Sequence, residues 1–226
     1  MGISKNDLKD ATISTIKGAV TTVPFIGGLF AEYISLAQSK IADKRASQWQ
    51  AMVEEQLQKL HSDFDSLTEN EFFFSCIQTA TINAMRAYQD EKRQLFANTI
   101  LNSVLLDLDS DKKMLFLSLL DRYTLAGIKL LKYYSENHYH EDDFIRRGGM
   151  VTSYSIGGTE YPTTYILKSC PDFKNDENYL KSLSEQLSGD GLISKIDFNI
   201  PESPKQARRK RTTRMGDEFL SFISSK

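Results

Sequence analysis

The sequence predicts a mostly α-helical protein, in which an N-terminal helical bundle precedes a smaller C-terminal domain of mixed α+β structure. Through the first 135 residues apolar side chains recur at helical spacing, and no stretch alternates as a strand would. From His138 onward the pattern is shorter and more broken, with glycine pairs at 148–149 and 157–158. Clear alternation appears only near the end of the chain. We therefore expect two domains, residues 1–136 and 137–226.

The composition is that of a globular protein with an ordinary core. The chain has 226 residues, of which 40% are hydrophobic and 11% are aromatic. A formal net charge of -2 argues against a protein that coats nucleic acid over its whole surface, but it is compatible with a local basic patch. Cys76 and Cys170 are the only cysteines in the sequence, which suits a reducing compartment better than a disulfide scaffold. We expect a cytoplasmic protein.

The N-terminal domain is predicted from apolar stripes and from helix-starting residues. A long helix is expected from about residue 29 into the sixties. Its stripe recurs at steps of three or four residues: Trp49, Val53, Leu57, Leu60 and Phe64. Thr68 and Glu71 fit a capping box for the next helix, and Asp109 and Ser110 can cap a later one. We expect an antiparallel bundle that pairs with itself or with another subunit.

The C-terminal domain is predicted from the stretch between about residue 177 and residue 223. A helix over 177–187 is followed by Gly191, and then apolar and polar side chains alternate from Leu192 to Ile200. Pro201 ends this predicted strand, because proline cannot donate a ladder hydrogen bond. A return strand is expected around Thr212. The apolar face of a last helix follows it: Phe219, Leu220, Phe222 and Ile223.

The sequence of this stretch resembles those of MarR-type and other bacterial winged-helix domains. The runs LSEQLSGDGLISK (183–195) and RTTRMGDEFLSFI (211–223) are similar to the places where such domains pass from a helix into the wing and then into a closing helix. The resemblance covers roughly the last fifty residues. It implies a winged-helix-like α+β domain, with a basic wing, and a binding function.

A second resemblance covers residues 20 to 135. Five runs occur in the same order as in a broad family of uncharacterised bacterial helical proteins: VPFIGGLFAEYI, KRASQW, LTENEFF, DEKRQLFANTILNS and FLSLLDRYTLAGIKLLKYY. The sequence departs from the family pattern at Gly127, where a histidine or similar polar residue is expected. This likeness implies a helical fold and no established activity.

The best candidate for a binding site lies between the two predicted strands, in what we call the basic segment (residues 205–214). It carries six basic side chains and no acid: Lys205, Arg208, Arg209, Lys210, Arg211 and Arg214. Clustered Lys and Arg gain affinity for nucleic acid by neutralising phosphates and releasing counterions. A solvated loop and a loop that docks on an acidic protein surface are the alternatives. We expect the segment to contribute little to the core, so that replacing its basic residues changes melting little.

The predicted helix at 177–187 supplies the remaining candidate contacts. Four of its polar side chains suit base edges or phosphates: Asn178, Lys181, Ser182 and Gln186. The same helix carries Glu177 and Glu185, whereas a sequence-reading helix is normally more basic. An acidic protein surface is therefore as good a target as nucleic acid. We predict a non-enzymatic binding or adaptor protein.

A function of a different class is suggested by the run from Gly18 to Ala31, which has no charged side chain. A membrane-acting toxin or a phage-defence effector would use such a stretch. A membrane span needs about 20 apolar residues, and this run is shorter and is bent at Pro24. A buried corner between two helices is favoured. A self-associating surface, in which Gly27 and Gly28 permit close approach of backbones, is a third interpretation.

The sequence predicts no catalytic, metal or cofactor site. One metal-like cluster is present: His138, His140, Glu141, Asp142 and Asp143. It lies on a polar linker, where a solvated turn is favoured over an ion site of defined geometry. We find no Ser-His-Asp ordering and no phosphate-binding glycine loop.

Overall fold

The structure is a computed structural model that describes residues 40–60, 67, 70–138, 159, 161–170, 173 and 176–225. The uncharged run from Gly18 to Ala31 lies outside the described residues, as do all members of the metal-like cluster except His138. In the described part of the chain, no helix has both the length and the apolar character needed to cross a membrane.

The described residues fall into two compact units. Residues 40–122 together with 222–225 form the first unit, and residues 123–221 form the second. The chain therefore enters the second unit once and returns to the first with its last residues.

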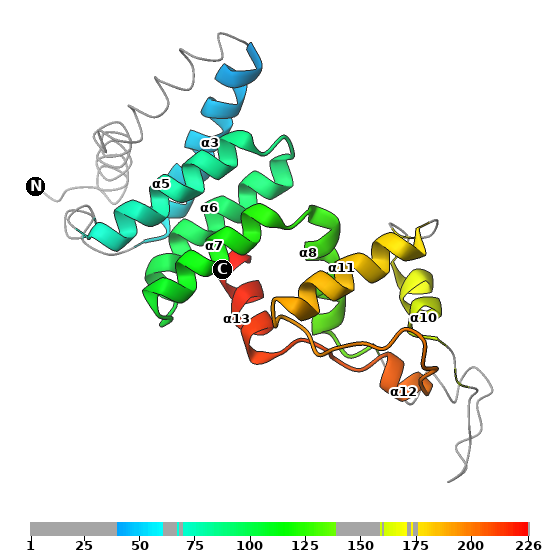
Figure 1. The fold of residues 1–226 in the computed structure, drawn as a ribbon. Helices are drawn as coiled ribbons and strands as arrows, with labels where there is room; N and C mark the ends of the chain where they lie inside the picture. Colours follow the sequence, from blue (N-terminus) through cyan, green and yellow to red (C-terminus); the bar gives the residue numbers. More distant parts are fainter. Residues whose placement is uncertain are drawn as a thin grey trace, which may run out of the picture. The chain divides into compact units, whose positions relative to one another are not determined.

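The first unit is a helical bundle, as the sequence predicts. Its helices are α3 (Lys40–Gln58), α5 (Glu71–Arg86), α6 (Asp90–Leu105) and α7 (Ser110–Arg122). Helix α6 lies against α3, α5 and α7, and α5 also lies against α3 and α7 (Figure 1). The predicted stripe from Trp49 to Leu60 is buried, and the indole nitrogen of Trp49 donates to the Thr81 hydroxyl at 3.3 Å. Phe64 lies outside the described residues.

Helix starts in the first unit follow local side-chain chemistry. Asp109 accepts hydrogen bonds from the backbone N–H groups of Asp111 and Lys112, at 2.9 and 3.2 Å, so its predicted capping role is confirmed. Helix α5 is capped by Asn70, whose side chain accepts from the backbone N–H of Phe73 at 2.9 Å. Thr68 of the predicted capping box lies outside the described residues.

Two asparagines of α6 bind the end of the chain. The side-chain amide of Asn98 donates to the carbonyl oxygen of Ile223 at 3.0 Å. That of Asn102 donates to the carbonyl oxygens of Phe222 and Ser224, both at 2.8 Å. The last carbonyls of a helix have no partner within the helix, so these amides satisfy them. The buried amides of Asn98 and Asn102 therefore serve to hold the C-terminal end of α13 against α6.

The second unit is also helical in its described part. It contains α8 (Leu125–Ser135), α10 (Pro162–Ser169), α11 (Glu177–Gly189) and α12 (Pro204–Ala207), and it contains α13 (Arg214–Ile223) as far as Ser221. Helix α11 packs against α8 and α10 (Figure 1). The hydroxyl groups of Tyr134 on α8 and Ser184 on α11 are 2.8 Å apart.

The prediction of an α+β winged-helix domain is wrong. Within the described residues no strand of a sheet is present; the extended segments on either side of α12 meet in one antiparallel bridge between Ile193 and Thr212. Two hydrogen bonds flank the bridge, from Ser194 N–H to the Arg211 carbonyl at 2.8 Å and from Thr213 N–H to the Leu192 carbonyl at 2.9 Å. The expected wing is replaced by the short helix α12.

Local turn chemistry explains why the predicted strand does not form. The carboxylate of Asp197 accepts from the backbone N–H of Asn199 at 2.9 Å, which turns the chain where the ladder would continue. Four apolar side chains of this stretch are nevertheless buried, Leu192, Ile193, Ile196 and Phe198, whereas Ile200 at its end is 58% exposed. Burial of these four side chains thus accounts for most of the apolar pattern, without a paired partner strand.

Candidate functional site

The basic segment is held at several backbone positions within the second unit. The N–H of His138 donates to the Arg208 carbonyl at 2.9 Å, and the N–H of Arg211 donates to the Tyr134 carbonyl at 2.7 Å. With the bond from Ser194 to Arg211, these contacts fix the path of the chain on both sides of Arg209 and Lys210. The six basic side chains are therefore carried on a backbone of defined course.

Arg211 is a core residue. Its side chain is 1% exposed and forms an ion pair with Glu202, whose side chain is 18% exposed. One terminal nitrogen also donates to the carbonyl oxygen of Gln206 at 3.3 Å, while Nε and the other terminal nitrogen are buried and have no hydrogen-bond partner among the described residues. The expectation that the whole basic segment contributes little to the core is wrong at this residue, because a buried charge depends on its partner.

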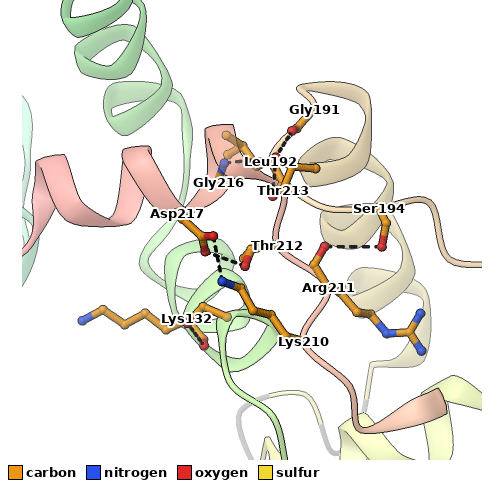
Figure 2. Close-up of polar contacts among 11 residues, drawn as sticks. Lys132, Gly191, Leu192, Ser194, Lys210, Arg211, Thr212, Thr213, Gly216 and Asp217 are labelled. Atoms are coloured by element: carbon orange, nitrogen blue, oxygen red, sulfur yellow. Dashed lines mark hydrogen bonds and ion pairs between the residues drawn. The ribbon is translucent and has the colours of Figure 1, made fainter. Parts of the chain in front are cut away.

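Lys210 points to the other side of the chain from Arg211 (Figure 2). Its ammonium group lies 2.7 Å from the carboxylate of Asp217, which also accepts a hydrogen bond from the Thr212 hydroxyl at 2.7 Å. Burial acts to raise the pKa of Asp217, but the hydrogen bonds from Lys210 and Thr212 and the charge of Lys210 outweigh it and hold the pKa below its ordinary value. The charge of Lys210 is thus already matched by an acid.

Arg214 is also matched by an acid. It is the first residue of α13, and its Nε lies 2.9 Å from the carboxylate of Glu218, one turn later in the same helix. The Arg214 side chain is 91% exposed. Exposed ion pairs of this kind contribute about 0.5 kcal/mol, so an anionic partner would have to break this pair before it could bind Arg214.

The other three basic side chains have no acidic partner among the described residues. Lys205 and Arg209 are exposed, and neither side chain makes a hydrogen bond or ion pair in that part of the chain. The guanidinium group of Arg208 is half-buried and lies over the ring of Tyr165 on α10, 5.1 Å from its centroid. Within the described chain, Lys205, Arg208 and Arg209 are therefore the cations of the basic segment that have no acidic partner.

The predicted contact residues of α11 stand apart from the basic segment. Asn178 and Ser182 are exposed, and Gln186 is half-buried. The ammonium group of Lys181 lies 2.7 Å from the carboxylate of Glu177 on the same helix. No hydrogen bond or ion pair joins any of these four side chains to residues 205–214 within the described chain. The ten candidates thus do not form one connected site.

Sequence reasoning missed the residues that decide which cations are available. Glu202, Asp217 and Glu218 stand just outside the two ends of the basic segment, and each neutralises one basic residue. Their position next to a basic run is a signal that can be read from sequence. Tyr165 and Lys168 of α10 gave no such signal, because only the fold brings their helix to Arg208.

The turn into α13 is built from close backbone contacts. The Thr213 hydroxyl donates to the Gly191 carbonyl at 2.6 Å, and the N–H of Gly216 donates to the Thr213 hydroxyl at 3.1 Å (Figure 2). Gly191 has φ +74°, a conformation that favours glycine. The hydroxyl of Thr213 therefore connects the chain after α11 with the first turn of α13.

Cys76 in the first unit is a buried thiol next to Ser103 and Lys113. Burial raises its pKa to about 11, although a hydrogen bond with Ser103 and the charge of Lys113 act in the opposite direction. The thiol is protonated at neutral pH and is a poor nucleophile. Among the described residues, no group of three or more His, Cys, Asp or Glu side chains is placed to hold a metal ion.

Comparison with protein-family models, with curated proteins and with solved structures found no match to this chain. The resemblance of residues 20–135 to a family of bacterial helical proteins therefore stays a prediction.

Proposed function

We propose that this protein is a non-enzymatic binding protein whose C-terminal unit engages an anionic partner, either nucleic acid or an acidic protein surface. Lys205, Arg208 and Arg209 are the contact residues. The observation that carries the proposal is that Lys205 and Arg209 are exposed and have no acidic neighbour in the described chain, on a backbone tied to α8. Basic residues in that setting are available to a ligand without first breaking an ion pair.

The hydrogen bonds that hold the backbone of the basic segment also favour a higher affinity for an anionic partner. Binding costs free energy when flexible side chains and loops become ordered, and a segment that is already ordered avoids part of that cost. The bond from His138 to Arg208 fixes the backbone, and the ring of Tyr165 holds the Arg208 guanidinium. Arg208 is therefore presented to a partner in a defined position.

The charges favour contacts to phosphates or carboxylates over contacts to base edges. Backbone phosphates are bound by point charges, whereas reading a base needs polar groups placed in a groove. Asn178 and Ser182 on α11 are exposed, but Lys181, the lysine of that helix, is paired with Glu177, and Glu185 adds an exposed negative charge that repels phosphates. We expect binding that depends on charge and shows little sequence preference.

The proposal is tested with two anionic probes, a DNA duplex and a polyglutamate peptide, at low ionic strength. Lys205→Ala/Arg209→Ala should weaken binding of the preferred probe roughly three- to tenfold, because each exposed charge contact contributes about 0.2–1 kcal/mol. Its melting temperature should equal that of the wild type, since neither side chain has a partner in the described structure. Lys195→Ala is the matched control, as an exposed lysine of the same unit outside the basic segment.

The two probes also separate the targets. Binding of DNA but not polyglutamate assigns nucleic acid, and the reverse assigns an acidic protein. If neither probe binds the wild type, or if Lys195→Ala weakens binding as much as the double variant does, the proposal fails.

A further inference from the structure

The ring of Tyr165 carries two cations. The Arg208 guanidinium lies 5.1 Å from its centroid, and the ammonium group of Lys168 lies 6.0 Å from it. Tyr165 itself is 6% exposed, so its ring is held in place by the surrounding core while the two charged groups lie against it. Each such contact contributes about 0.5–1 kcal/mol, which is enough to favour one position of the charged group. Two positive charges are thereby gathered beside α10.

An exposed aromatic side chain, that of Tyr161, lies at the start of the helix that carries Tyr165 and Lys168. Tyr161, Tyr165 and Lys168 follow the spacing i, i+4 and i+7 at and along α10, which places them on one side of the helix. Tyr161 is 51% exposed, and its side chain makes no hydrogen bond or ring contact in the described chain. From Tyr161 to Tyr165 the chain rises about 6 Å along the helix axis. One side of α10 thus carries the exposed ring of Tyr161 and the charge of Lys168, and the Tyr165 ring between them in sequence carries Arg208.

The chemistry of this row distinguishes among anionic partners. A base that is free of its duplex gains about 1–3 kcal/mol by stacking on an aromatic side chain. The bases of a duplex are already stacked on one another, and the carboxylates of an acidic protein have no ring to stack. Only a single strand uses both the ring and the charges.

We propose that α10 and Arg208 form a surface for single-stranded nucleic acid, on which a base stacks on Tyr161 and the flanking phosphates bind Lys168 and Arg208. This inference rests on the proposed function and narrows its target. Every base has a π-face, so stacking on Tyr161 does not depend on which base is present. This agrees with the low sequence preference that we expect of the basic segment.

The test measures fluorescence anisotropy of a labelled oligothymidylate and of a duplex of similar length, with the full chain. Tyr161→Ala should weaken binding of the single strand by roughly tenfold, the effect of losing one stacked base. It should leave duplex binding unchanged. Tyr161→Phe should bind the single strand as the wild type does, because the ring is retained. Tyr88→Ala is the control, since Tyr88 of the first unit is 75% exposed.

Folding is checked by melting, which should be the same for Tyr161→Ala and the wild type. The inference is overturned if the wild type prefers the duplex, or if Tyr161→Ala binds the single strand as the wild type does. It is also overturned if Tyr161→Ala weakens both probes equally. In these cases the proposed function still stands when Lys205→Ala/Arg209→Ala weakens binding of duplex DNA or polyglutamate. If the wild-type protein binds none of the anionic probes, both proposals fail.

Discussion

At the scale of single residues, six basic side chains that look equivalent in sequence differ in what surrounds their charge. Arg211 is 1% exposed and paired with Glu202, whereas Arg209, two residues earlier, is exposed. Lys210, between them, is paired with Asp217. Burial and pairing, which depend on the acids that the fold brings close, therefore divide the segment into structural and available cations.

The division predicts opposite outcomes for two similar substitutions. Arg211→Met should lower the free energy of unfolding by about 2–4 kcal/mol, because it leaves the carboxylate of Glu202 unpaired in a largely buried position. Arg209→Met, the matched control, should change it by less than about 0.5 kcal/mol. Urea denaturation of both variants measures the difference. Arg211→Met/Glu202→Met should recover part of the loss; a single variant as stable as the wild type would contradict the core role of Arg211.

At the scale of elements, the start of α13 depends on one glycine. A Cβ atom at Gly216 would lie 2.1 Å from the carbonyl oxygen of Leu192, which is a backbone atom of the bridged segment. The same segment receives the hydrogen bond from Thr213 N–H. Any side chain at position 216 must therefore push α13 away from the chain that follows α11.

Gly216→Ala should consequently destabilise the second unit by about 2 kcal/mol or more, as overpacking against a constrained neighbour does. Gly189→Ala is the matched control. Gly189 is the last residue of α11 and would place its Cβ with nothing within 4 Å. Thermal melting of both variants tests this, and equal melting temperatures would show that the close approach is relieved without cost.

The elements also show what sequence patterns can and cannot predict. Helical stripes such as that of Trp49 and Val53 predicted helices correctly, because periodic burial along a helix is a local property. The alternation from Leu192 to Ile200 predicted a strand wrongly. A strand needs a partner over several residues, and here the turn at Asp197 and the helix α12 limit the pairing to Ile193 and Thr212.

At the scale of the whole molecule, the helical character and the location of the basic segment could be predicted from sequence, and the state of its charges could not. Counting residues 205–214 gives six cations, but Glu202, Asp217 and Glu218 neutralise three of them. The neighbourhood of Arg208 depends on α10, about forty residues earlier in the chain. Long-range contacts of this kind leave no periodic trace in the sequence.

The central claim is that the available cations, rather than all six, carry binding, and salt dependence measures it most directly. The slope of log K against log salt for duplex DNA changes by about 0.9 for each phosphate contact. Lys205→Ala/Arg209→Ala should make the wild-type slope shallower by about 1.8. Lys210→Ala/Arg214→Ala, which removes two acid-paired cations, should change it by less than half as much. Equal changes in the two double variants, or a wild type whose binding to DNA and to polyglutamate is independent of salt, would contradict the account.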